Sequence, residues 1–330
     1  MKTRTFGPRG PQVSEIGLGT WQLGGSEWGQ VTDAEALATL HAAAEAGTTF
    51  IDTADIYGQG RSETRIGRFL RERPDRDRFF VATKLGRSSD PGWPENFTLA
   101  AMRRHTEGSL ARLGVEALDL TQTHCIPPEQ MKTGAVWDHL RRLQQDGLIK
   151  RFGASVESVQ EALLCLDVEG LSALQIIFNL FRQKPIEALF QQAKRQGVAL
   201  IVRLPLASGL LAGKFAKGTS FAPADHRNFN RDGAAFNVGE TFAGLPFEKG
   251  VELADALKTF VPQQLTMSQF ALRWCLDFDA VTTVIPGATR PDQARQNATA
   301  ADLPPLEPQL HAKLATFYRE QVAAHVRGKY

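Results

Sequence analysis

The chain has 330 residues, and its 38 lysine and arginine residues nearly balance its 36 aspartate and glutamate residues, for a formal net charge of +2. This balance argues against nucleic acid or a membrane surface as the main partner. Apolar residues make up 42% and charged residues 22%, as in an ordinary soluble globular protein. The length suits either two domains or one α/β barrel, and we predict a single domain over residues 1–330.

The cysteines and the N-terminal residues bear on location and metal binding. The three cysteines, Cys125, Cys165 and Cys275, have no short paired spacing, so we predict neither disulfides nor a metal site. Residues 1–8 lack the apolar core of a signal peptide, and no apolar run reaches the roughly 18 residues of a membrane span. We therefore expect a cytoplasmic protein whose partner is a small molecule. No pattern in the sequence indicates an oligomeric state.

Taken in chain order, the local patterns alternate between strand and helix. Residues 2–15 predict a hairpin that turns at residues 7–10, and Glu15–Gly19 predicts the first barrel strand. Helical spacing over Thr32–Ala46 has Thr32 or Asp33 as its cap and Gly47 as its stop. Later helices are predicted at Glu63–Arg71, Thr98–Leu113, Thr133–Asp146, Ser158–Val168, Pro185–Gln196 and Ser268–Asp277. Later strands include Ile149–Ala154, Ala173–Ile177, Val198–Val202 and Val281–Ile285.

This alternation predicts an α/β fold, a closed (β/α)8 TIM barrel with an N-terminal β-hairpin and a functional site at the carboxyl ends of its strands. Residues 215–247, after the seventh strand, break the rhythm and are rich in Gly, Asn and Asp. Such a long connection is either a functional loop, such as a lid, or disordered. The tail, residues 304–330, has a helical pattern and is expected to pack across the barrel.

Three apolar runs, each typical of a buried strand, end in chemically active side chains. The runs 49–51, 79–83 and 118–123 lead into Asp52, Lys84 and His124, and Tyr57 follows Asp52 by five residues. Because the carboxyl ends of parallel barrel strands face one site, we expect these four side chains to meet.

These residue types suit the protonation of an oxygen on which negative charge develops. A phenol with a pKa near 10 is a poor acid at neutral pH, but an adjacent ammonium favours the phenolate and lowers that pKa. Lys84 supplies the ammonium in this hypothesis, and Asp52 holds it charged and in place. His124 either orients a carbonyl oxygen or assists the proton transfer.

The order and spacing of these motifs resemble the aldo-keto reductases. The resemblance rests on Gly17–Trp21, Phe50–Gly58, Ser62-Glu63, Lys84 and His124, and it runs from about Thr5 to about Leu303. It implies a catalytic tetrad of Asp52, Tyr57, Lys84 and His124 in a (β/α)8 barrel that uses NADPH. The segment around Gly287 and Ala288 resembles that of the bacterial branch of the family, which is related to the potassium-channel β-subunits.

We expect the cofactor to bind in a way that differs from the Rossmann fold, because no Gly-x-Gly-x-x-Gly turn opens a βαβ unit. The segment from Ile285 to Asn297 instead ends a strand and enters a helix, whose first N–H groups would receive a phosphate. The resemblance implies contacts from Gly287, Thr289, Arg290, Gln293 and Asn297, with Thr289 and Arg290 on a 2′-phosphate. This favours NADPH and leaves NADH open. The alternative is an ordinary Pro-initiated helix with an exposed Arg.

The rest of the cofactor site is expected around residues 203–214. Small residues there let the backbone approach a pyrophosphate, and Lys214 adds charge. Arg203 stands where many members of the family have a Tyr that stacks on nicotinamide, and its guanidinium can either stack or reach a phosphate. The remaining contacts that the resemblance implies are Leu206, Ser208, Gly209 and Leu211 on the phosphate side, Ser155 and Gln175 on the nicotinamide amide, and Gly19, Thr20 and Trp21 opposite.

The sequence therefore predicts an enzyme that reduces aldehydes or ketones to alcohols with NADPH, with Tyr57 as the proton donor. One alternative is a redox-sensing regulatory subunit that keeps the fold and the nucleotide but turns over slowly. A second is a barrel lyase or isomerase that needs no cofactor.

Overall fold

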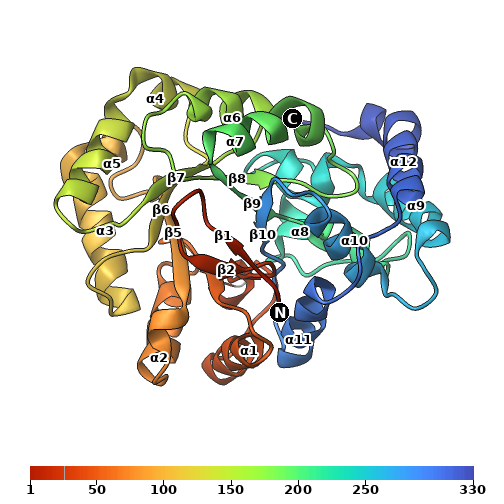
Figure 1. Ribbon diagram of the computed structural model, residues 1–330, viewed down its shortest axis with the longest axis horizontal. Helices are drawn as coiled ribbons and strands as arrows, with labels where there is room; N and C mark the ends of the chain where they lie inside the picture. Colours follow the sequence, from red (N-terminus) through yellow and green to blue (C-terminus); the bar gives the residue numbers. More distant parts are fainter. Residues whose placement is uncertain (26) are drawn as a thin grey trace.

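Eight parallel strands form the centre of the computed structural model, which describes residues 1–25 and 27–330 (Figure 1). Neighbours in the sheet follow chain order from β3 to β10. The two edges meet, because the Gly17 N–H donates to the Val284 carbonyl at 2.8 Å and the Gly19 N–H to the Pro286 carbonyl at 3.1 Å. The predicted TIM barrel is confirmed. Its strands are β3 (Leu18–Gly19), β4 (Phe50–Asp52), β5 (Phe80–Leu85), β6 (Leu120–His124), β7 (Phe152–Ser155), β8 (Ala173–Ile177), β9 (Ala199–Arg203) and β10 (Val281–Val284).

The predicted hairpin is also confirmed, and it closes the N-terminal end of the barrel. Strands β1 (Thr3–Thr5) and β2 (Gln12–Ser14) pair antiparallel. Phe6 and Val13 of the hairpin are buried in one cluster with side chains from inside the barrel. The Phe6 ring lies 4.7 Å from Phe80 and 6.0 Å from Phe50, between centroids. The interior is therefore a packed core, and open space is left at the opposite end, where the strands finish.

Helices cover the outside of the barrel, and their apolar faces fill the space against the sheet (Figure 1). Helix α1 begins as predicted, since Thr32 and Glu35 form a reciprocal capping box. The helices of the described chain are α1 (Asp33–Glu45), α2 (Arg61–Arg71), α3 (Leu99–Leu113), α4 (Pro128–Thr133), α5 (Ala135–Gln145), α6 (Val159–Leu166), α7 (Gln191–Gln196), α8 (His226–Phe229), α9 (Phe247–Leu257), α10 (Met267–Leu276), α11 (Pro291–Ala298) and α12 (Pro308–Phe317).

Two regions differ from the sequence-based expectation. Helix α9 was not predicted, because Gly250 weakens its helical pattern; a Cβ there would lie 2.6 Å from Leu210, so the glycine allows close packing. The tail helix α12 does not cross the barrel. It packs on the outer helices, where Phe317 contacts Phe260 at 5.7 Å between ring centroids and His311 Nε2 lies 2.8 Å from an Asp277 carboxylate oxygen.

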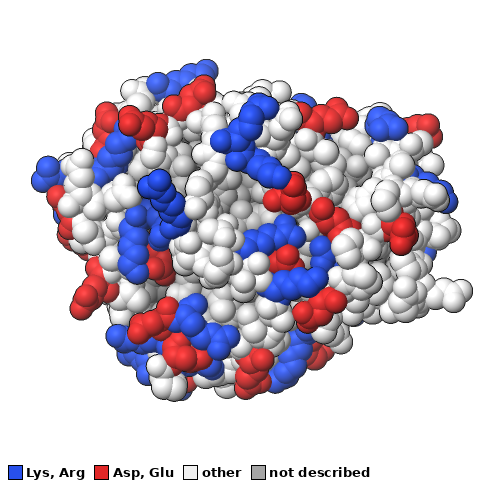
Figure 2. Space-filling view, viewed as in Figure 1, with Lys and Arg blue, Asp and Glu red and all other residues white. Residues whose placement is uncertain are grey.

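The long connection after β9, the seventh barrel strand, is confirmed as a loop with only short helical turns. Within residues 1–25 and 27–330, no helix has the length and apolarity needed to cross a bilayer. On the face shown in Figure 2, basic and acidic side chains are interspersed, which agrees with the small net charge.

Candidate active site

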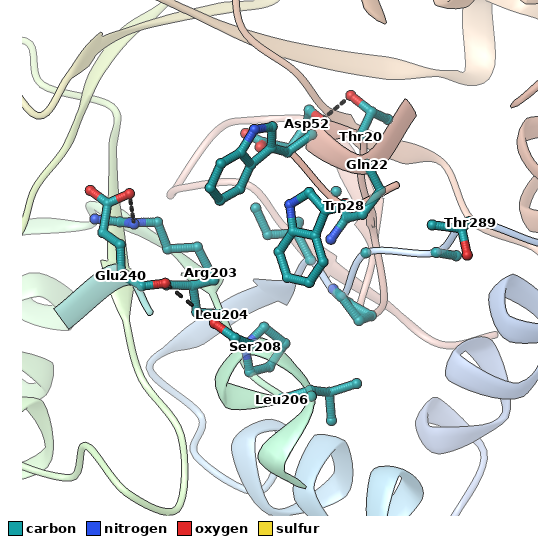
Figure 3. A pocket seen from close by; sticks show the side chains of 18 of the residues that line it. Thr20, Gln22, Trp28, Asp52, Arg203, Leu204, Leu206, Ser208, Glu240 and Thr289 are labelled. Atoms are coloured by element: carbon teal, nitrogen blue, oxygen red, sulfur yellow. Dashed lines mark hydrogen bonds and ion pairs between the residues drawn. The ribbon is translucent and has the colours of Figure 1, made fainter. Parts of the chain in front are cut away.

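The carboxyl ends of three neighbouring strands bring the predicted residues together. Asp52 ends β4, Lys84 lies near the end of β5 and His124 ends β6. Tyr57 lies in the loop that follows β4. Asp52, Tyr57 and His124 line a cavity of about 370 Å³ at the mouth of the barrel (Figure 3). Lys84 lies behind this wall, with its side chain 1% exposed. Three strand ends thus hold the site on rigid backbone.

Lys84 and Asp52 form a buried ion pair. Lys84 Nζ lies 2.7 Å from Asp52 Oδ2 and donates a second hydrogen bond of 2.7 Å to the Thr53 carbonyl. The other Asp52 oxygen accepts a 2.6 Å hydrogen bond from Gln175. Burial, the largest single effect, favours a neutral amine, yet Asp52 and Tyr57 together hold the pKa of Lys84 above its ordinary value. Lys84 is therefore charged at neutral pH.

Tyr57 lies against this cation. Lys84 Nζ is 3.4 Å from the Tyr57 hydroxyl oxygen and 5.0 Å from the centre of its ring. Burial raises the pKa of Tyr57 above its ordinary value, and the Lys84 ammonium acts in the opposite direction. From the sequence we expected the ammonium to lower this pKa. The ammonium does act in that direction, but burial, which sequence spacing does not show, is the larger effect. Without Lys84, the phenol would be a still weaker acid.

His124 faces Tyr57 across the cavity, with the two rings edge to face and 5.7 Å apart. Burial, together with the charges of Arg87, Lys84 and Arg203, holds the pKa of His124 well below its ordinary value. The imidazole is therefore neutral near pH 7. A neutral imidazole can donate a hydrogen bond from one ring nitrogen to a carbonyl oxygen without competing for its proton.

A cluster of opposite charges lies beside the site, and the sequence did not reveal it. Arg203 donates to the Val156 carbonyl at 3.0 Å and lies 3.5 Å from the Glu240 carboxylate. Arg87 pairs with the same Glu240 at 3.4 Å and with Glu157 at 3.1 Å. In Figure 3 the Arg203 guanidinium points toward Glu240, away from Leu206 and Thr289. Arg87 and Glu240 were missed because neither ends a recognisable strand.

The same cavity extends into a groove that holds most of the predicted cofactor residues. Three predicted residues do not line the groove: Leu211 is buried in the core, Asn297 donates to the Gly287 carbonyl at 3.3 Å, and Arg290 is an exposed residue 3.3 Å from Asp292. The predicted residues that line the groove are Gly19, Thr20, Trp21, Ser155, Gln175, Arg203, Leu206, Ser208, Gly209, Lys214, Gly287, Thr289 and Gln293. Lining residues that the sequence analysis did not assign to the cofactor include Gln22, Trp28, Pro205, Phe215, Arg227 and Glu240.

The groove has the features of a dinucleotide site. Ala207 and Ser208 have left-handed backbone with φ of 47° and 55°, and Gly209 follows at 99°. Left-handed conformations in residues other than glycine cost about 1–3 kcal/mol each and cluster at ligand clamps. At the other end of the groove, the terminal amide of Gln22 lies against Gly287, 2.0 Å from where a Cβ would stand. The left-handed turn at residues 207–209 and the segment at Gly287 thus border the two ends of one groove.

Aromatic side chains cover the outer side of the groove. Trp28 lies 5.6 Å from Trp21 and 4.2 Å from His226, measured between ring centroids. The Arg227 guanidinium sits 5.0 Å above the Trp28 ring, and the His226 backbone N–H donates to the Glu27 carbonyl at 3.0 Å. Trp28 and the loop after β9 therefore form one wall.

A parallel (β/α)8 barrel with a Tyr, Lys, Asp and His at its mouth, beside a long groove, is the arrangement of a class of carbonyl oxidoreductases. Residues 15–319 match the model of the aldo/keto reductase family, so the chain belongs to this family and is an NAD(P)H-dependent oxidoreductase.

Relatives and solved structures agree with this assignment. The chain is 28% identical to the aldo-keto reductase YhdN of Bacillus subtilis, over 89% of this chain and 86% of that one. It is 30% identical to a probable voltage-gated potassium channel subunit beta of Oryza sativa, over 93% of each chain. The fold matches the holo form of the aldo-keto reductase AKR11C1 of Bacillus halodurans with a TM-score of 0.78 and 25% identity, over 96% of each chain.

Asp55, three residues after Asp52, is a buried carboxyl outside the cavity. Neither of its oxygens has a hydrogen-bond partner in the described chain. Burial and the nearby Glu63 raise the pKa of Asp55 to about 7. The folded protein therefore keeps this proton at pH values where the unfolded chain has lost it, so this carboxyl lowers stability as pH rises from about 4 to 7.

Replacing this carboxyl by an amide, Asp55→Asn, should stabilise the protein at neutral pH. We expect the free energy of unfolding in urea to rise by roughly 2–4 kcal/mol at pH 8 and by less at pH 5. Asp77→Asn is the control, because the Asp77 side chain is 98% exposed and should change neither value. A gain for Asp55→Asn that is equal at the two pH values would contradict the assignment.

Proposed function

We propose that this protein reduces aldehydes or ketones to alcohols with NADPH, and that Tyr57 donates the proton. The observation that carries this proposal is the contact of 3.4 Å between the Tyr57 hydroxyl and an ammonium that a buried carboxylate keeps charged. NADPH, when bound in the groove, would supply a hydride for the carbonyl carbon. As charge develops on the carbonyl oxygen, Tyr57 gives up its proton to that oxygen.

The neighbouring residues support this transfer. The Lys84 ammonium stabilises the phenolate that Tyr57 becomes, and Asp52 keeps Lys84 in place. His124, being neutral, donates a hydrogen bond to the carbonyl oxygen and positions it near the Tyr57 hydroxyl. The aromatic wall of Trp21 and Trp28 excludes water from the carbonyl.

The groove would hold the dinucleotide. The turn at Leu206, Ser208 and Gly209 would take the pyrophosphate, and Lys214 would add charge, whereas Leu211 is buried and its N–H donates to the Leu206 carbonyl. Gly19, Thr20 and Trp21, with Ser155 and Gln175, would hold the nicotinamide. Because Glu240 and the Val156 carbonyl occupy the Arg203 guanidinium, we assign Arg203 to the nicotinamide end and not to a phosphate.

The adenosine end favours NADPH over NADH in this proposal. Thr289 and Arg290 stand at the start of α11, where they would hold a 2′-phosphate. Gln293, which accepts from the Thr289 N–H, and Asn297, which donates to the Gly287 carbonyl, would contact the adenine. Arg290 is exposed and pairs only with Asp292, so its side chain is available to turn toward the phosphate.

Removing the Arg290 guanidinium should shift the preference between NADPH and NADH. We expect Arg290→Ala to raise KM for NADPH about tenfold, as the loss of one charge-assisted hydrogen bond implies, and to leave KM for NADH nearly unchanged. Steady-state kinetics with both nucleotides measure this. Equal effects on the two nucleotides would assign Arg290 to a part of the site that does not read the 2′-phosphate.

Removing the proposed proton donor should abolish most turnover. For Tyr57→Phe we expect a decrease in kcat of about 10²–10⁴, because general acid catalysis supplies a factor of that size. NADPH should still bind, which quenching of tryptophan fluorescence checks. A Tyr57→Phe variant that turns over within about threefold of wild type would exclude Tyr57 as the acid.

The relationship to a probable channel β-subunit supports one alternative, a regulatory subunit that binds nucleotide and turns over slowly. Oxidation of NADPH measured with a panel of aldehydes and ketones separates the possibilities. Turnover with any of them supports the enzyme. Tight NADPH binding without turnover supports the regulatory subunit.

A further inference from the structure

A strained turn lies next to the cofactor groove, in the loop after β9. Phe242, Ala243 and Gly244 have φ values of 52°, 58° and 84°, so three consecutive residues are left-handed and two of them are not glycine. Phe242 and Ala243 are fully buried. Conformations of this kind persist only where the surroundings hold them in place. Contacts from elsewhere in the chain must therefore hold this turn.

Arg327, in the C-terminal tail, supplies many of these contacts. Its backbone N–H and its Nε both donate to the Gly244 carbonyl, at 3.1 Å and 2.9 Å. Its Nη2 donates to the carbonyls of Leu245 and Arg231, and its Nη1 pairs with Asp232 at 2.7 Å. A Cβ at Gly244 would lie 2.5 Å from the Arg327 carbonyl oxygen, so the tail packs directly on the turn.

The tail itself is anchored to the barrel. Arg182, which is 1% exposed, donates to the Lys329 carbonyl at 2.6 Å and lies 4.1 Å from the centre of the Tyr330 ring. Lys329 also lies 3.5 Å from Glu157 of the charge cluster. The contacts of Lys329 and Tyr330 with the barrel thus fix the position of Arg327, which in turn contacts the strained turn.

The other side of the strained turn contacts the phosphate loop. The Phe242 N–H donates to Ser208 Oγ at 3.1 Å, and Ser208 Oγ donates to the Glu240 carbonyl at 3.4 Å. Both hydrogen-bonding roles of this hydroxyl are therefore used within the protein. Ser208 is itself left-handed, so the two strained turns hold each other through one side chain. Glu240, whose backbone carbonyl accepts the hydrogen bond from Ser208, also carries the carboxylate that pairs with Arg203.

We propose that Arg327 is a positioning residue for the dinucleotide. By fixing the turn at 242–244, it sets the backbone of Ser208 and Gly209 and the Glu240 carboxylate that orients Arg203. The inference rests on the proposed function, because it concerns the affinity of the same groove. None of the Arg327 hydrogen bonds and ion pairs in the described chain reaches Asp52, Tyr57, Lys84 or His124, so the larger effect of its removal falls on nucleotide binding.

The test compares NADPH binding and turnover in Arg327→Ala with wild type. We expect Kd and KM for NADPH to rise about tenfold while kcat at saturating NADPH stays within about twofold, and Arg327→Lys to recover part of the affinity. The matched control is Arg319→Ala, since Arg319 is exposed and its side chain donates to Thr316 of the same helical stretch. Arg327→Gln serves if the alanine variant does not fold. Unchanged Kd, or a loss confined to kcat, would overturn the proposal.

A double-mutant cycle tests the path itself. If Arg327 acts through Ser208, the loss of affinity in Ser208→Ala/Arg327→Ala should be close to the larger single loss, about tenfold, and not the product of the two. Multiplying losses would contradict the path. The proposed function fails separately, since in that case the wild-type protein itself would show no turnover with any carbonyl compound, whatever the affinities of the variants for NADPH.

Discussion

The buried pair of Lys84 and Asp52 is the interaction on which the site depends. Taking two charges out of water costs several kcal/mol per ion, and only close geometry and further hydrogen bonds offset that cost. Both conditions are met, because Gln175 and the Thr53 carbonyl satisfy the remaining groups. A hydrophobic pair of the same volume would serve stability as well or better. The pair is therefore best understood through what it does for Tyr57, which lies against the ammonium.

The barrel and its loops contribute in different ways. Asp52, Lys84 and His124 sit on strand ends, so their relative positions follow from the parallel register of β4, β5 and β6. The groove for the dinucleotide is built from loops, and it needs left-handed backbone at residues 207–209 and 242–244. Strain of this kind must be held by contacts from elsewhere in the chain. The tail supplies such contacts at Arg327, which gives residues 327–330 a reason to be packed on the mouth of the barrel.

Much of the fold and of the Tyr57 site followed from sequence because strand ends are local features. An apolar run followed by Asp, Lys or His is visible without any tertiary information, and the barrel then brings the three together. Glu240 and Arg87 were not predictable in the same way, since Arg87 lies 153 residues along the chain from Glu240 and 70 from Glu157, in no recognisable pattern. Helix α9 was hidden by Gly250, whose role is packing against Leu210. The pKa of Tyr57 needed the depth of its burial, which no sequence spacing conveys.

The central claim is that the Lys84 ammonium makes Tyr57 a stronger acid than burial alone would allow. The chain has three tyrosines, so the ionisation of Tyr57 can be isolated by ultraviolet difference titration against Tyr57→Phe. The account predicts that Tyr57 ionises at a higher pH in Lys84→Met than in otherwise unchanged protein. The same ionisation pH in both proteins would contradict it.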